Sequence, residues 1–100
     1  MNKVEYNGWT NYETWLLNLH MTNEQGGTDF VMEFLDERTE LHPRFVYLAR
    51  FLQGTYEDLV PYDQASNLFW RDLINSALSE VNWMEIARHR VEEWEEMQDE

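Results

Sequence analysis

The sequence contains no cysteine in its 100 residues. Disulfide bonds and thiolate metal sites are therefore excluded, and a reducing cytoplasm is the expected location. Long apolar runs are also missing, since every such run is far shorter than the roughly 20 residues that span a bilayer. Residues 1–6 lack the apolar segment of a secretory signal. We therefore expect a cytoplasmic protein that does not associate with a membrane.

Basic residues are scarce. Seven lysines and arginines stand against twenty acidic residues, which gives a formal net charge of −13. Nucleic acids and anionic lipids should repel such a chain, whereas basic protein surfaces should attract it. Direct binding to nucleic acid or to a membrane is therefore not expected. An alternative stays open, in which the charge serves only to keep a tryptophan-rich protein soluble.

Aromatic residues, by contrast, are plentiful, with five each of Trp, Tyr and Phe. Each buried ring removes roughly 150–250 Å² from water, so a core can form in a chain of this length. We expect residues 1–100 to form a single helical domain, with a short irregular N-terminus and an acidic C-terminal end. Because five tryptophans can exceed what one small core holds, a homodimer through an aromatic patch is a further alternative.

Apolar residues recur at the i, i+3, i+4, i+7 spacing of amphipathic helices along most of the chain. The spacing and the flanking turn residues predict helices at about 10–23, 28–40, 44–53, 62–78 and from 82 onward. The third is apolar nearly all round, which makes it the expected central helix. The fourth is expected to bury a broad face that includes Ala65, Leu68, Phe69, Leu73 and Ala77. The predicted fold is all-α, a compact bundle of about five short helices.

Local signals mark the expected helix ends. Thr10 followed by Glu13 fits a capping box, and Asn82 followed by Glu85 repeats it at the start of the last helix. The pair Asn7-Gly8 predicts a turn ahead of the first helix. The glycines at 26–27 predict the end of that helix, and Gly54 predicts the end of the third.

No arrangement of residues typical of catalysis or metal binding is apparent. Carboxylates are numerous, but none is set apart as a pair in two different environments of a cleft. The histidines lack the i, i+4 spacing of a zinc-binding helix, and no glycine-rich phosphate loop occurs. We therefore expect a protein that is not an enzyme and needs no metal or cofactor. Arg88 and Arg90 are expected to pair with acids one turn away on their own helix.

Acidic residues gather on two segments. The polar face of the predicted second helix carries Glu33, Asp36, Glu37 and Glu40. The C-terminal end carries Glu92, Glu93, Glu95, Glu96 and Asp99. Carboxylates spaced along rigid helices can imitate the phosphates of a nucleic-acid duplex. These residues are the candidate partner-binding surface, against the alternative of an ordinary solvated face.

Two short segments stand out by their tryptophans. Their notable residues are Trp9, Asn11, Glu13, Thr14 and Trp15 in the first segment, and Asn82 and Trp83 in the second. The structural interpretation is that Trp9 folds back over the first helical turn while Trp15 enters the core. The alternative is an exposed aromatic binding patch.

These segments resemble the signature of a group of small phage and plasmid proteins. Residues 9–15 are similar to its W-x-N-x-x-T-W pattern, and residues 81–87 are similar to its V-N-W-x-E-I-A pattern. The resemblance covers about 20 residues at opposite ends of the chain. It implies a protein of a mobile element, acting in the cytoplasm of the host cell. Small acidic proteins from such elements include anti-CRISPR and anti-restriction proteins, several of which mimic DNA.

The resemblance and the charge together predict a non-enzymatic inhibitor of a bacterial defence nuclease complex. Its partner would be a defence protein or nucleoprotein complex with a basic surface. The alternative is an acidic accessory or regulatory protein that binds a basic protein encoded by the same phage.

Overall fold

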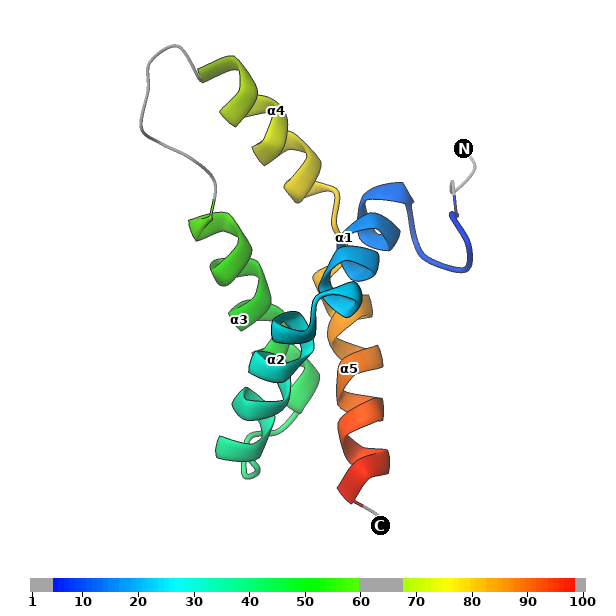
Figure 1. Cartoon of the computed structure of the whole chain (residues 1–100), viewed down its shortest axis with the longest axis vertical. Helices are drawn as coiled ribbons and strands as arrows, with labels where there is room; N and C mark the ends of the chain where they lie inside the picture. Colours follow the sequence, from blue (N-terminus) through cyan, green and yellow to red (C-terminus); the bar gives the residue numbers. More distant parts are fainter. Residues whose placement is uncertain (1–4, 60–67, 99–100) are drawn as a thin grey trace.

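The computed structural model describes residues 5–59 and 68–98. These residues form five α-helices, and the only β pairing among them is one isolated bridge between Tyr6 and Trp9. The helices are α1 (Tyr12–Asn23), α2 (Gln25–Glu37), α3 (Arg44–Asp58), α4 (Leu68–Ser79) and α5 (Trp83–Gln98) (Figure 1). The prediction of an all-α bundle of about five helices is confirmed. None of the described helices is long and apolar enough to cross a membrane.

The core lies where α2, α3 and α5 pack side by side, below α1 and α4 in Figure 1. The fully buried side chains include Val31, Leu35, Leu48, Leu52 and Ile86. α5 contributes six buried residues, whereas α3 contributes three. The expectation that the third helix is central was therefore wrong. α3 keeps one side in solvent, and α5 packs against α1, α2 and α3.

A tight turn precedes α1. The backbone N–H groups of Tyr6 and Trp9 each donate to the other residue's carbonyl, at 2.9 and 2.8 Å. Asn7 and Gly8 between them have φ angles of 50° and 87°, the left-handed values that a type I′ turn requires. The turn predicted from Asn7-Gly8 is therefore confirmed.

This turn carries Tyr6 onto the first turn of α1. The Tyr6 ring lies 5.1 Å from Tyr12 and 4.7 Å from Trp15, measured between ring centroids. Trp15 is half-buried in this surface cluster, so the expectation that it enters the core was wrong. Trp9 packs against the ring of His89 on α5, with centroids 4.5 Å apart. Neither tryptophan forms a fully exposed patch.

The N-termini of α1 and α5 each carry an asparagine cap. The side-chain oxygen of Asn11 accepts the backbone N–H of Thr14 at 2.9 Å, and that of Asn82 accepts the N–H of Glu85 at 3.1 Å. Capping by Asn82 is as predicted, but the return bond of the predicted box is missing, because the N–H of Asn82 donates to Thr14 and not to Glu85. The predicted box of Thr10 with Glu13 does not form, because Asn11 is the N-cap and sits three residues before Thr14.

These two helix starts also complete each other. The carboxylate of Glu85 accepts the backbone N–H of Thr10 at 3.0 Å, and the hydroxyl of Thr14 accepts the backbone N–H of Asn82 at 2.8 Å. In an ordinary capping box the third helical residue serves its own cap. Here the side chains of Thr14 and Glu85 each accept a backbone N–H from the segment that leads into the other helix. The side-chain amide of Asn82 adds a bond to the Thr10 hydroxyl at 3.0 Å.

Glycines occupy helical positions here rather than helix ends. Only Glu24 separates α1 from α2, so Gly26 and Gly27 lie in the first turn of α2. A Cβ atom on Gly27 would overlap the carbonyl oxygen of Met21, so this glycine permits the close approach of the two helices. Gly54 lies inside α3, which continues to Asp58. α1 ends at Asn23, where its end was predicted, but the glycines after it lie in α2. The stop predicted at Gly54 was wrong.

α4 stands apart from the α2, α3 and α5 core (Figure 1). None of its side chains is buried, and only Arg71 and Leu78 are half-buried. The expectation that Leu68, Phe69, Leu73 and Ala77 are buried was wrong, because none of them is covered by another helix of the described residues. Ala65 and the predicted start of this helix near residue 62 lie outside the described residues.

Candidate functional site

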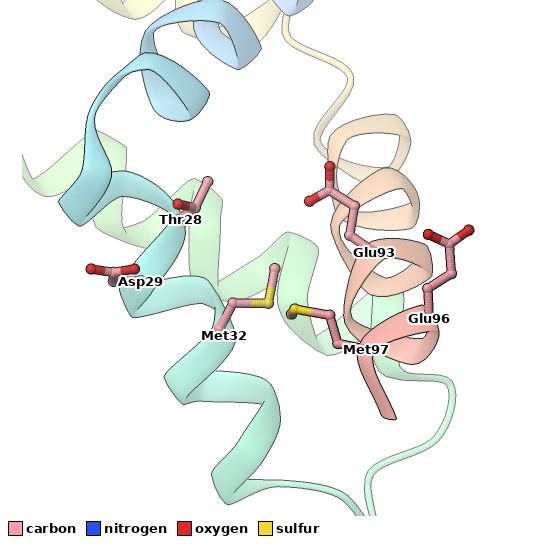
Figure 2. Close-up of a pocket in the computed structure, with 6 residues that line it drawn as sticks. All are labelled: Thr28, Asp29, Met32, Glu93, Glu96 and Met97. Carbon is pink, nitrogen blue, oxygen red and sulfur yellow. The ribbon is translucent and has the colours of Figure 1, made fainter. Parts of the chain in front are cut away.

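A groove of about 550 Å³ runs between α2 and α5. α2 contributes Thr28, Asp29 and Met32, and α5 contributes Glu93, Glu96 and Met97 (Figure 2). The two methionine side chains point toward one another across the gap between the helices. Segments more than 60 residues apart in the sequence therefore form one acidic, methionine-floored surface, which we call the α2–α5 groove.

The chemistry of the α2–α5 groove is that of a binding surface. The thioethers of Met32 and Met97 are polarisable and adapt to irregular apolar shapes. Asp29, Glu93 and Glu96 are exposed residues of the lining, and in Figure 2 the carboxylates of Asp29 and Glu96 lie on the outer sides of their helices. A basic side chain can lay its apolar stem on such a floor while its charged end reaches a carboxylate.

A hydrogen bond fixes α5 beside α2. The indole N–H of Trp94 donates to the Asp36 carboxylate at 2.8 Å. The Trp94 side chain is buried in the core, and this part-buried bond gives its indole N–H an acceptor on α2. Asp36 therefore holds the two walls of the groove in register.

The groove also lies next to a buried arginine. Arg90 is 4% exposed and donates to the Asn18 side-chain oxygen at 2.8 Å and to the Glu93 carboxylate at 3.1 Å. Burial lowers the pKa of the Arg90 guanidinium below its usual range, and the charge of Glu93 acts in the opposite direction. The Nε atom of Arg90 has no hydrogen-bond partner among the described residues. Glu93 is thus engaged inside the protein as well as facing the groove.

The predicted acidic residues do not form one continuous face. On α2, Glu33 follows Asp29 by one helical turn, whereas Glu37 pairs with Arg38 at 3.4 Å. Glu40 is exposed beyond the end of α2, and Asp99 lies outside the described residues.

The acids of α5 divide between two sides of that helix. Glu93 and Glu96 line the α2–α5 groove, whereas Glu92 and Glu95 line a separate hollow with Phe45 and Arg88. Glu95 also pairs with Arg44 at 3.4 Å. The charge of this second side is therefore partly neutralised within the chain, and the more strongly acidic surface is the one shared with α2.

The basic residues of α5 serve the fold. Arg88 lies over the ring of Phe45, with its guanidinium carbon 4.4 Å from the ring centroid. The expected pairing of Arg88 with an acid on its own helix was therefore wrong among the described residues. Arg90 does pair on its own helix, with Glu93 at the i+3 position.

The residues of the two tryptophan segments fall into different places. Asn11, Thr14 and Asn82 meet in the reciprocal caps, together with Thr10 and Glu85. Trp83 is buried beside Tyr56 on α3, with ring centroids 6.0 Å apart. Glu13 is not part of the caps. It lines a hollow between α1 and the end of α4.

Sequence reasoning missed Thr28, Asp29, Met32 and Met97 as groove residues. Thr28 and Asp29 lie at the start of the helix predicted for residues 28–40, and the methionines carry no signal of their own. They acquire a role only through the packing of α2 on α5. Within the described residues, no group of three histidine or acidic side chains could hold a metal ion.

Comparison with known proteins yields a family but no function. No curated protein and no solved structure matches the chain significantly. The model of a family of unknown function, DUF7249, matches residues 2–100, which is nearly the whole sequence. The chain therefore belongs to the family of unknown function DUF7249.

Proposed function

We propose that this protein is a non-enzymatic inhibitor that binds a basic surface of a bacterial defence nuclease complex. The α2–α5 groove would be its contact surface. The observation that carries the proposal is the meeting of Asp29 on α2 with Glu93 and Glu96 on α5 around one groove. The net charge of −13 and the resemblance to mobile-element proteins support the choice of partner.

The charge suits rapid recognition of a nucleic-acid-binding channel. A strongly acidic protein is steered toward a basic surface over distances up to roughly the Debye length, about 8 Å at physiological salt. Steering raises the association rate and makes binding salt-dependent. Carboxylates on two helices held together by Asp36 and Trp94 keep fixed spacings, so little order is lost on binding.

A second candidate is an accessory protein that binds a basic protein of the same mobile element. The methionine floor of the groove favours it, because a DNA mimic needs only charge whereas Met32 and Met97 offer apolar contact. A basic amphipathic segment of a protein would use both. The two candidates share the groove and differ in the origin of the partner.

Affinity capture with matched variants tests the groove. The natural chain would be immobilised and exposed to host lysate, with and without the proteins of the element, at low and high salt. The groove variant carries Asp29→Asn and Glu96→Gln, and leaves Glu93 in place because Glu93 pairs with Arg90. The control carries Asp58→Asn and Glu80→Gln, which remove the same charge from exposed positions elsewhere on the chain.

We expect a nuclease-complex subunit to be captured at low salt and released by salt. The groove variant should bind it at least about tenfold more weakly, and the control should bind it within about twofold of the natural chain. Equal weakening in both variants would show that the affinity depends on net charge alone. It would refute the groove as the binding site. Capture of a basic protein of the element instead would select the second candidate.

A further inference from the structure

The apolar side of α4 is the most exposed apolar surface in the described part of the chain. Its members are 39% to 66% exposed and comprise Phe69, Trp70, Leu73 and Ile74. The rings of Phe69 and Trp70 touch each other edge to face, with centroids 5.2 Å apart. A contiguous apolar surface of this size is typical of an interaction site.

α4 carries none of the protein's net negative charge. The helix holds one basic residue, Arg71, and one acidic residue, Asp72, so its formal charge is zero. α2, by comparison, holds four acids and no base. Two copies of this chain would repel each other strongly through α2 or the end of α5. They can meet at α4 with the least repulsion.

The side chains of α4 are large at the beginning of the helix and small toward its end. Trp70, Leu73, Ile74 and Ala77 follow the i, i+3, i+4, i+7 spacing and so share one stripe. Next to Ala77 lies a hollow of about 200 Å³ between α4 and α1, whose α1 wall includes Leu16 and Leu17. The stripe therefore has a projecting aromatic pair at its beginning and an apolar depression at its end.

We propose that two copies of the chain pair through α4, antiparallel, about a two-fold axis between Leu73 and Ile74. In this arrangement Trp70 of each copy lies over Ala77 of the other and fills the hollow beside it. A parallel pair would set Trp70 against Trp70 and leave both hollows open. Antiparallel pairing also makes the interface self-complementary, as a two-fold axis requires.

The surface has the size of a weak, transient dimer interface. The exposed fractions of Phe69, Trp70, Leu73 and Ile74 correspond to roughly 450 Å² per copy, if a fully exposed aromatic ring presents about 200–250 Å² and the aliphatic side chains somewhat less. A symmetric pair would bury about 900 Å², which is below the roughly 1,200 Å² of stable interfaces and in the range of weak ones. The dimer is therefore expected to be weak and to depend on its aromatic anchors.

The pairing is separable from the proposed function. The α2–α5 groove uses other helices, so α4 pairing leaves it open. Salt also acts in opposite directions on the two contacts. It screens the repulsion between two copies of charge −13 and so strengthens the dimer, whereas it weakens binding to a basic partner.

Sedimentation equilibrium of the whole chain tests the dimer. We expect a monomer–dimer equilibrium that shifts toward the dimer as salt is added. Trp70→Glu should weaken dimerisation at least about 30-fold, as loss of a central aromatic anchor does. The matched control is Met84→Glu, which places the same charge at an exposed apolar side chain of another helix, 38% exposed. It should change the dissociation constant of the dimer by less than about threefold. Circular dichroism should show that both variants are folded.

Single cysteines test the orientation, because the natural chain has none. Leu73→Cys lies near the axis and should form a disulfide-linked dimer under mild oxidation. Ala77→Cys should not, since antiparallel pairing separates the two Ala77 positions by about 10 Å along the helix axes, beyond disulfide reach of roughly 7 Å between Cα atoms. A linked dimer through Ala77→Cys would overturn the antiparallel arrangement. A monomer at every concentration up to roughly 1 mM, or equal weakening by both glutamates, would overturn the dimer.

Discussion

The backbone N–H of Asn82 donates a hydrogen bond to the hydroxyl of Thr14, 68 residues earlier in the chain. Thr14 is 0% exposed, and the same hydroxyl donates to the side-chain oxygen of Asn11 at 2.6 Å. One buried hydroxyl therefore joins the N-termini of α1 and α5. The position should tolerate serine far better than valine, although valine has nearly the same shape.

Replacing Thr14 by Val should destabilise the protein by about 2 kcal/mol, because it leaves the backbone N–H of Asn82 without its acceptor. Urea unfolding followed by circular dichroism measures this change. Thr14→Ser keeps the hydroxyl and should lower the free energy of unfolding clearly less. Thr22→Val is the control on the same helix, since the Thr22 hydroxyl is exposed and bonds only to its own helix backbone. It should cost less than about 0.5 kcal/mol. Equal effects at Thr14 and Thr22 would contradict the joint role of Thr14.

Neighbouring glycines of α2 should respond in opposite directions to alanine. Gly27→Ala forces a methyl group into the carbonyl of Met21 and should cost about 2 kcal/mol, as overpacking does. A methyl group on Gly26 meets nothing within 4 Å. Gly26→Ala should therefore stabilise the helix by about 0.5–1 kcal/mol. Thermal unfolding of the two variants gives the comparison, and loss of stability in Gly26→Ala would show that the junction of α1 and α2 is not as described.

The hydrogen bond between Trp94 and Asp36 should stabilise the fold, beyond any effect of the Asp36 charge. Asp36→Ala leaves the part-buried indole N–H without this acceptor and should cost about 1–2 kcal/mol in urea unfolding. Glu37→Ala removes a carboxylate of the same sign that forms only an exposed pair with Arg38, and should cost less than about 0.5 kcal/mol. A smaller loss at Asp36 than at Glu37 would refute the structural role of Asp36.

Stability should fall in alkali partly through Tyr56. Burial, and secondly the charge of Glu24, raise the pKa of the Tyr56 phenol above its usual 10.0. The folded state therefore holds the phenol proton more tightly than the unfolded chain. The resulting stabilisation is complete below pH 10.0 and is lost as the pH rises through the folded-state pKa. The free energy of unfolding should thus fall more steeply above pH 10.0 in the natural chain than in Tyr56→Phe. Parallel pH profiles would exclude this contribution.

The sequence predicts the helices well where the signals are local. Asn82 caps α5 and Asn7-Gly8 forms its turn, because each signal depends on a few adjacent residues. The reciprocal caps could not be predicted, since they depend on which two helix starts meet in space. Gly27 shows the same limit, because a glycine that permits close approach looks in sequence like a glycine that ends a helix.

The candidate site was predictable in composition but not in arrangement. The acids of α5 follow one another in the sequence, yet Glu93 and Glu95 face opposite neighbours because Trp94 between them points into the core. The phase of the helix therefore decides which acids meet Asp29. For α4 the periodicity shows an apolar face, but it cannot show whether a neighbour from the same chain covers it.

The reciprocal caps have a consequence for how the chain is made. Thr14 leaves the ribosome early, whereas Asn82 and Glu85 are near the end of the sequence. Until they emerge, the start of α1 lacks the partners that complete it, and domains tend to fold as units. The nascent chain therefore cannot close its fold stepwise from the front. Closure has to wait until Asn82 and Glu85 have emerged, and a transcript cut short before residue 82 would yield a polypeptide exposed to chaperones and proteases.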